Sequence, residues 1–171
     1  HTFACRSLNT RIIMSTRASI VLKLKDEDIG KKMKFEPSRL PLGITCDMAG
    51  VDKVEWVELS KRYIMIYHNY DSYPSGMGVY LYYIYNDYDK IINLLLGGNV
   101  SSILGTMLMQ YICYPDGVWT DEKPIVYDEM PEKEEDYIYL FENGIWYLKS
   151  NRYPEWVDLE MVLRAERDKL L

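Results

Sequence analysis

Apolar side chains recur at every second position in the stretch 15–25, which predicts a strand with one buried face. These positions are Ala18, Ile20, Leu22 and Leu24. The stretches 54–59 and 62–70 are rich in β-branched and aromatic residues and are separated by two residues, so we expect two antiparallel strands joined by a tight turn. Residues 26–50 show no clear period and are expected to form a long excursion with one short helical turn.

The strongest hairpin signal lies near the end of the chain. The alternating runs 137–141 and 145–149 flank Asn143-Gly144, a dipeptide that readily adopts the positive φ angles of a tight hairpin turn. A further short strand is expected at 125–127, and the sequence Tyr-Pro-Asp-Gly at 114–117 predicts a turn.

Residues 79–85 are apolar or aromatic all round, and after the interruption at Asn86-Asp87 an apolar run resumes at 89–96. Two helices in series fit this pattern best, the second with an Asp near its N-terminal cap and glycine after its end. On propensity alone, residues 79–85 also fit a strand. A short helical piece is expected at 101–104. A terminal helix is expected at 156–170, with an apolar stripe at helical spacing. The stripe comprises Leu159, Val162, Leu163 and Leu170, whereas Arg164, Glu166, Arg167 and Asp168 are expected to face mostly outward.

Together these elements predict an α+β fold, in which an antiparallel meander sheet packs against two central helices and a C-terminal helix. The chain has 171 residues and no internal repeat or linker-like tract, so we expect a single domain at 14–171. Residues 1–13 contain Arg and Ser but no acid, and they look like an upstream or artificially added extension that precedes a natural start at Met14.

Composition narrows the function classes. A net charge of −6 argues against a general nucleic-acid binder, which usually carries a basic face. Lysines and arginines gather in residues 1–34 and acids in residues 128–136, and both stretches are expected to be solvated. The chain has 16 tyrosines against 3 phenylalanines, which favours half-buried aromatic surfaces, because tyrosine combines a large apolar ring with a hydroxyl group.

The cysteines indicate a reducing compartment. Cys5, Cys46 and Cys113 are odd in number and widely spaced, so they fit neither a disulfide framework nor a zinc site. We expect no cofactor and no metal. No apolar run approaches the roughly 18 residues needed to span a bilayer, so the sequence predicts a soluble protein with no membrane partner.

One loop stands out as a candidate site, between an expected strand and an expected helix. It reads Asp71-Ser72-Tyr73-Pro74-Ser75-Gly76-Met77-Gly78. Proline stiffens it, the two glycines permit positive φ or close backbone approach, and its polar groups are crowded into a short arc. The spacing matches neither a Walker A nor a dinucleotide-binding motif. A rigid strand-to-helix turn and a ligand- or partner-binding loop both remain open.

Tyr67, His68 and Asp71 could form a proton-transfer cluster, although adjacent strand residues point to opposite faces. His68 is the one histidine outside position 1, so a histidine-dependent mechanism would depend on it alone. We assign no catalytic residue. The candidate binding residues are Tyr67, His68, Asp71, Tyr73, Ser75, Gly76 and Gly78.

Four motifs of the chain belong together: Ser15-Thr16-Arg17-x-Ser19-Ile20, the loop from Tyr70 to Gly78, Gly98-Asn99-Val100-Ser101-Ser102, and the run from Tyr137 to Tyr147. With these motifs the chain resembles a group of uncharacterised proteins of bacteriophages and mobile elements. The resemblance covers most of residues 15–150. The group's loop usually has glycine where this chain has Ser72, which weakens any claim that a flexible backbone is essential there. The resemblance implies a phage context and carries no known activity or catalytic residue.

We therefore expect a non-enzymatic accessory protein in the host cytoplasm, which binds a host or defence protein or sequesters a small signalling ligand. Two alternatives stay open. One is a virion or assembly protein, in which the tyrosine-rich surface would hold homo-oligomers together. The other is a small hydrolase that acts on nucleotides through His68 and Asp71.

Overall fold

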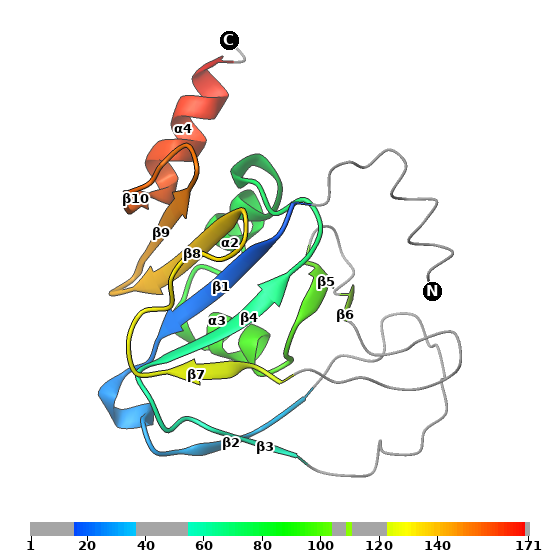
Figure 1. Ribbon diagram of the computed structural model, residues 1–171, viewed down its shortest axis with the longest axis vertical. Helices are drawn as coiled ribbons and strands as arrows, with labels where there is room; N and C mark the ends of the chain where they lie inside the picture. Colours follow the sequence, from blue (N-terminus) through cyan, green and yellow to red (C-terminus); the bar gives the residue numbers. More distant parts are fainter. Residues whose placement is uncertain (1–15, 37–54, 104–108, 111–122, 170–171) are drawn as a thin grey trace, which may run out of the picture.

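The computed structural model describes residues 16–36, 55–103, 109–110 and 123–169. The three cysteines, the extension 1–13 and the turn expected at 114–117 lie outside these residues. Within them, eight strands form one mainly antiparallel sheet in the order β10-β9-β8-β1-β4-β5-β6, and β7 pairs with β4 (Figure 1). The strands are β1 Ala18–Lys23, β4 Tyr63–His68, β5 Val100–Ser102, β6 Met109–Gln110, β7 Ile125–Tyr127, β8 Tyr137–Glu142, β9 Ile145–Ser150 and β10 Val157–Asp158. The predicted α+β class is confirmed.

The first predicted strand lies at the centre of the sheet. β1 pairs antiparallel with β4 and parallel with β8, and its residues from Ala18 to Leu22 are buried. Burial of both faces is what a central strand requires, and it explains why Ser19 and Val21 are as inaccessible as their apolar neighbours. The strand order differs from that of a meander, because β1 lies between two strands that are distant in sequence and β4 also pairs parallel with β5.

Of the two predicted hairpins, one is confirmed and one is wrong. β8 and β9 pair in register from Tyr137 opposite Ser150 to Glu142 opposite Ile145, and Asn143 and Gly144 have φ of 53° and 80°. The earlier hairpin does not form, because β3 (Trp56–Glu58) pairs with β2 (Lys32–Lys34) in a separate two-stranded sheet. β4 instead uses its edges for β1, β5 and β7.

The helices lie in the order the sequence predicts. A 3-10 turn spans Asp26–Asp28, a π-helical turn spans Pro74–Gly78, and the α-helices are α2 Val79–Tyr83, α3 Tyr88–Leu95 and α4 Leu159–Lys169. The Asp87 side chain caps α3 by accepting a hydrogen bond from the backbone N–H of Lys90. The helical piece expected at 101–104 is wrong, because residues 100–102 form strand β5.

One face of the sheet carries the main core. Buried residues of α2, α3 and α4, such as Leu81, Ile91 and Leu159, belong to the same cluster as Ile20 and Ile64 of the sheet. Figure 1 shows α2 and α3 behind the sheet strands. Among the described residues, no helix is long and apolar enough to cross a membrane.

The opposite face carries a smaller cluster, and its cover is aromatic. The buried members are Val21, Met65, Ile138 and Leu140, and the half-buried side chains packed on them include Tyr63, Tyr67, Tyr127, Tyr147 and Trp156. Half-burial is the position expected for tyrosine, since the ring covers apolar surface while the hydroxyl reaches water.

Candidate functional site

The strand-loop-helix element predicted around residues 71–78 is confirmed. β4 ends at His68, and the π-helical turn Pro74–Gly78 leads directly into α2. Asp71 lies between them with φ of 54°, a left-handed conformation that is uncommon for a residue other than glycine. Aspartate is among the side chains that tolerate this conformation best, so a charged side chain stands at the left-handed position of the loop.

Ser72 holds this loop in place and is fully buried. Its backbone N–H donates to the Thr16 hydroxyl oxygen at 2.8 Å, and its carbonyl accepts from the Tyr139 hydroxyl at 2.6 Å. Its own hydroxyl contacts Nδ1 of the His68 ring at 2.8 Å. Segments distant in the sequence therefore meet at one serine, a role that no local sequence pattern indicates.

His68 is a structural member of the same network. Its side chain is 1% exposed, and its Nε2 accepts a hydrogen bond from the backbone N–H of Ile103 at 3.0 Å. Because Nε2 is an acceptor, the ring proton of the neutral imidazole lies on Nδ1 and is donated to Ser72. Burial lowers the pKa of His68 to about 3, so the ring stays neutral at neutral pH with both nitrogens occupied.

The loop amides bond within the loop. The N–H groups of Gly76 and Gly78 donate to the Tyr73 carbonyl, at 2.9 and 3.4 Å, and the Met77 N–H donates to the Asp71 carbonyl at 2.9 Å. These three donors are therefore not directed at an external anion. Gly76 is needed for close approach, since a Cβ there would lie 2.6 Å from the Asp71 carbonyl oxygen. Neither Gly76 nor Gly78 has a positive φ.

Three of the candidate residues face outward from this held loop. Asp71 and Ser75 are exposed and Tyr73 is half-buried. The Tyr73 hydroxyl donates to Asp71 Oδ1 at 3.4 Å, which brings a ring and a carboxylate together at the surface. The pKa of the Tyr73 hydroxyl is raised, first by burial and then by the Asp71 charge. Tyr73 is therefore a neutral hydrogen-bonding group at physiological pH.

Tyr67 does not join this group. It lies on the opposite face of β4 from His68 and packs on the cluster that contains Val21 and Met65. The pKa of Tyr67 is raised by burial and by neighbouring Tyr127. The structure therefore separates the seven candidates into an outer rim (Asp71, Tyr73 and Ser75), an inner support (His68, Gly76 and Gly78), and Tyr67 on the far face of the sheet.

A cavity of about 330 Å³ adjoins the loop. Pro74 forms part of its wall, and the other walls include Tyr137 at the start of β8, Tyr153 after β9, and Glu166 of α4. Glu166 was expected to face outward, but it is half-buried and lines this cavity. Among the described residues, no group of His, Cys, Asp and Glu side chains could hold a metal ion.

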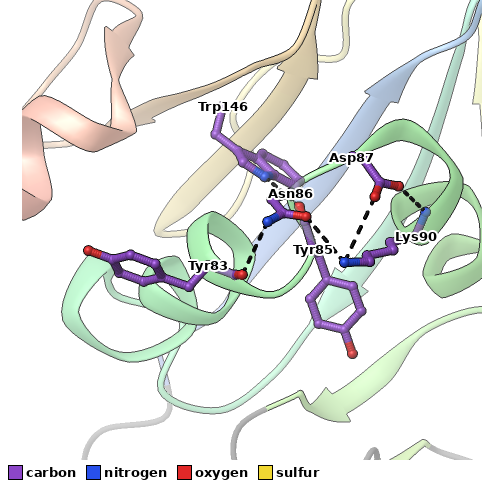
Figure 2. A network of polar contacts seen from close by, with 6 residues as sticks. All are labelled: Tyr83, Tyr85, Asn86, Asp87, Lys90 and Trp146. Carbon is purple, nitrogen blue, oxygen red and sulfur yellow. Dashed lines mark hydrogen bonds and ion pairs between the residues drawn. The ribbon is translucent and has the colours of Figure 1, made fainter.

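A larger cavity, of about 590 Å³, lies at the other end of β1 beside the link between α2 and α3. Its lining includes Asn86 and Asp87. Figure 2 shows the contacts of these two side chains. The Asn86 amide donates to the Tyr83 carbonyl at 3.3 Å, and the Lys90 ammonium contacts the side chains of both Asn86 and Asp87. The Trp146 indole N–H donates to the Tyr85 carbonyl at 2.9 Å, which ties β9 to this link. The polar groups on this wall therefore satisfy one another.

The site is thus a rigid surface loop beside a small cavity, and no hydrogen bond within the described residues joins His68 to Asp71. No protein-family model, curated protein or solved structure matches the chain. Its candidate binding surface is therefore inferred from its own contacts.

Proposed function

We propose that the protein is a non-enzymatic binding protein whose contact surface is the outer rim of the loop, formed by Asp71, Tyr73 and Ser75. Its partner is a host or defence protein, or a small signalling ligand, in the cytoplasm of a bacterial host. The phage context comes from the sequence resemblance. The main support for a binding role is the anchoring of Ser72. Its hydrogen bonds hold the loop against the body of the fold, while the rim residues point outward.

Rigidity is what makes such a loop suited to binding. Ordering side chains and loops on association opposes binding, at roughly 0.5–1.5 kcal/mol for each immobilised side chain. A loop that the fold already holds avoids most of this loss. The paired Asp71 and Tyr73 offer a carboxylate, a hydroxyl and a ring face within one small area, a combination that suits a polar or basic partner group.

A hydrolase that uses His68 and Asp71 has less support. A general base needs a free nitrogen within reach of its substrate, whereas both nitrogens of His68 have protein partners and the ring is 1% exposed. Asp71 points its carboxylate toward Tyr73. Proton transfer through this pair would require the loop to leave its anchored position.

The binding role predicts a loss of partner capture when the rim loses its charge and hydroxyl. We expect Asp71→Asn combined with Tyr73→Phe to reduce the material captured from bacterial lysate at least about tenfold, because the few hot-spot residues at the centre of an interface each cost about 2 kcal/mol or more when they are truncated. The melting temperature is expected to stay within a few degrees, since asparagine also accepts positive φ. The protein is immobilised and incubated with lysate, and mass spectrometry of the released material measures the capture.

A matched control removes the same groups elsewhere. Asp89 and Tyr83 are exposed on α3 and α2, so Asp89→Asn with Tyr83→Phe makes the same chemical change outside the loop. This control should capture partner as the wild type does. Equal capture by the wild type, the control and the loop variant would mean that the loop is only a turn.

A further inference from the structure

The cavity beside the loop has an unusual wall. Leu159, Val162 and Leu163 form the apolar stripe of α4, and Glu166 follows them at the same helical spacing. Glu166 thus occupies a position at which the helix repeat calls for an apolar residue. Charged side chains are rarely buried completely without a partner, and Glu166 is half-buried at this position.

One oxygen of the Glu166 carboxylate lacks a hydrogen-bond partner among the protein atoms that the structure describes. Its Oε2 atom is buried and is the one buried side-chain oxygen or nitrogen there without a hydrogen bond. A buried acceptor left unsatisfied costs about 1–3 kcal/mol, and more when it is charged. Such a group indicates a missing donor. Because the terminal torsion of glutamate turns readily, either oxygen can present itself to the cavity.

The remaining walls of the cavity favour a ligand with a positively charged hydrogen-bond donor. Asp136 adds a second carboxylate, one oxygen of which accepts from the Arg17 backbone N–H at 2.9 Å. The one basic side chain in the wall, Arg152, lies over the Tyr153 ring with its guanidinium 5.6 Å from the ring centre, and it forms no ion pair with Glu166. The pKa of the Tyr137 hydroxyl is raised by burial, then by Asp136 and Glu166, as expected in a negative potential.

We propose that this cavity binds a small organic cation, an aliphatic ammonium or guanidinium. Its N–H groups would donate to Glu166, and its alkyl part would lie against Pro74 and the Tyr137 ring, because the Arg152 guanidinium already lies over the Tyr153 ring. Charge-assisted hydrogen bonds and aromatic faces together are the usual means of holding such cations. A volume of about 330 Å³ lies at the small end of ligand pockets. The inference builds on the proposed binding role, since it names a ligand class for the cavity next to the rim.

Simple probes test this directly. The ¹⁵N-labelled protein is titrated with butylguanidinium or butylammonium, and with butanol as the neutral probe of similar shape, while amide shifts are followed by NMR. The cations should shift amides of α4 and of the start of β8 in a saturable way, and butanol should not. Glu166→Gln should weaken cation binding at least about tenfold, because it keeps the shape and removes the charge.

Asp168→Asn is the matched control, since Asp168 is exposed on the same helix and the net charge changes equally. It should leave the affinity within about twofold. The proposal is overturned if the cations cause no saturable shift, if butanol binds as well as they do, or if Glu166→Gln and Asp168→Asn behave alike. The outcome is independent of the capture experiment, because neither Asp71 nor Tyr73 is altered and no partner protein is present.

Discussion

Gly76→Ala is expected to lower the free energy of unfolding by about 2–3 kcal/mol, at the upper end of what overpacking usually costs. The added methyl would lie 2.6 Å from the Asp71 carbonyl oxygen and 3.0 Å from the Tyr73 ring. The carbonyl cannot move away easily, because it accepts the Met77 N–H and belongs to a residue already held at φ of 54°. Urea unfolding followed by tryptophan fluorescence measures the change.

Gly78→Ala is the matched control two residues along. Gly78 has helical angles, φ −56° and ψ −38°, and an added methyl would meet its nearest neighbour, a Leu159 methyl, at 3.4 Å. Since alanine is favoured over glycine in a helix by about 1 kcal/mol, this variant should be unchanged or more stable. If both variants lose the same stability, the close approach at Gly76 is not what shapes the loop.

Stability is expected to fall by about 2 kcal/mol between pH 7 and pH 5 because of His68. The folded pKa is about 3, whereas an unfolded histidine titrates near 6.5. Between these two values the unfolded chain binds a proton that the folded protein excludes, so acid favours unfolding. The stabilisation is complete above about pH 6.5 and is lost progressively as the pH falls toward about 3. Urea titrations at a series of pH values measure the slope.

His68→Gln serves as the reference for this slope. It removes the titrating ring while keeping a polar side chain, so the variant is less stable at every pH but should lose most of the dependence between pH 7 and pH 5. A wild type whose stability is flat across this window would show that His68 gains its proton equally well in the folded state, which the buried network does not allow.

The elements that the sequence predicted well are those determined by local chemistry. The hairpin at Asn143-Gly144 follows from the turn preference of two residues, and the start of α3 follows from the Asp87 cap. The half-burial of tyrosine was equally predictable, and among the described tyrosines only Tyr83 and Tyr139 depart from it. Each of these features depends on the residue type itself or on neighbours within a few positions.

The errors concern pairings between distant segments. The two-residue link after β3 suggested a hairpin, but the Leu59 N–H donates to the Lys31 carbonyl and keeps this strand with β2. The stretch after Gly98 has little intrinsic preference for helix or strand. Val100 lies in a strand because it pairs with His68 of β4. Strand partners are chosen by tertiary packing, which local propensity does not report.

The site divides in the same way. The loop was visible from its proline and glycines, whereas its anchoring by Thr16 and Tyr139 joins residues 56 and 67 positions away from Ser72. No local pattern reports such contacts. Glu166 was different, because a signal was present: it continues the spacing of Leu159 and Val162 along α4. A charged residue on an apolar stripe is a reason to include it among the candidates.

We propose that His68 supports the loop and transfers no proton, and this central claim is tested most directly by long-range ¹H–¹⁵N NMR of the His68 ring as the pH is varied from about 8 to 4.5. We expect a neutral ring with its proton on Nδ1 throughout this range. A ring that titrates with a pKa near the ordinary value of about 6.5, or that carries its proton on Nε2, would contradict the claim and make His68 a candidate catalytic base again.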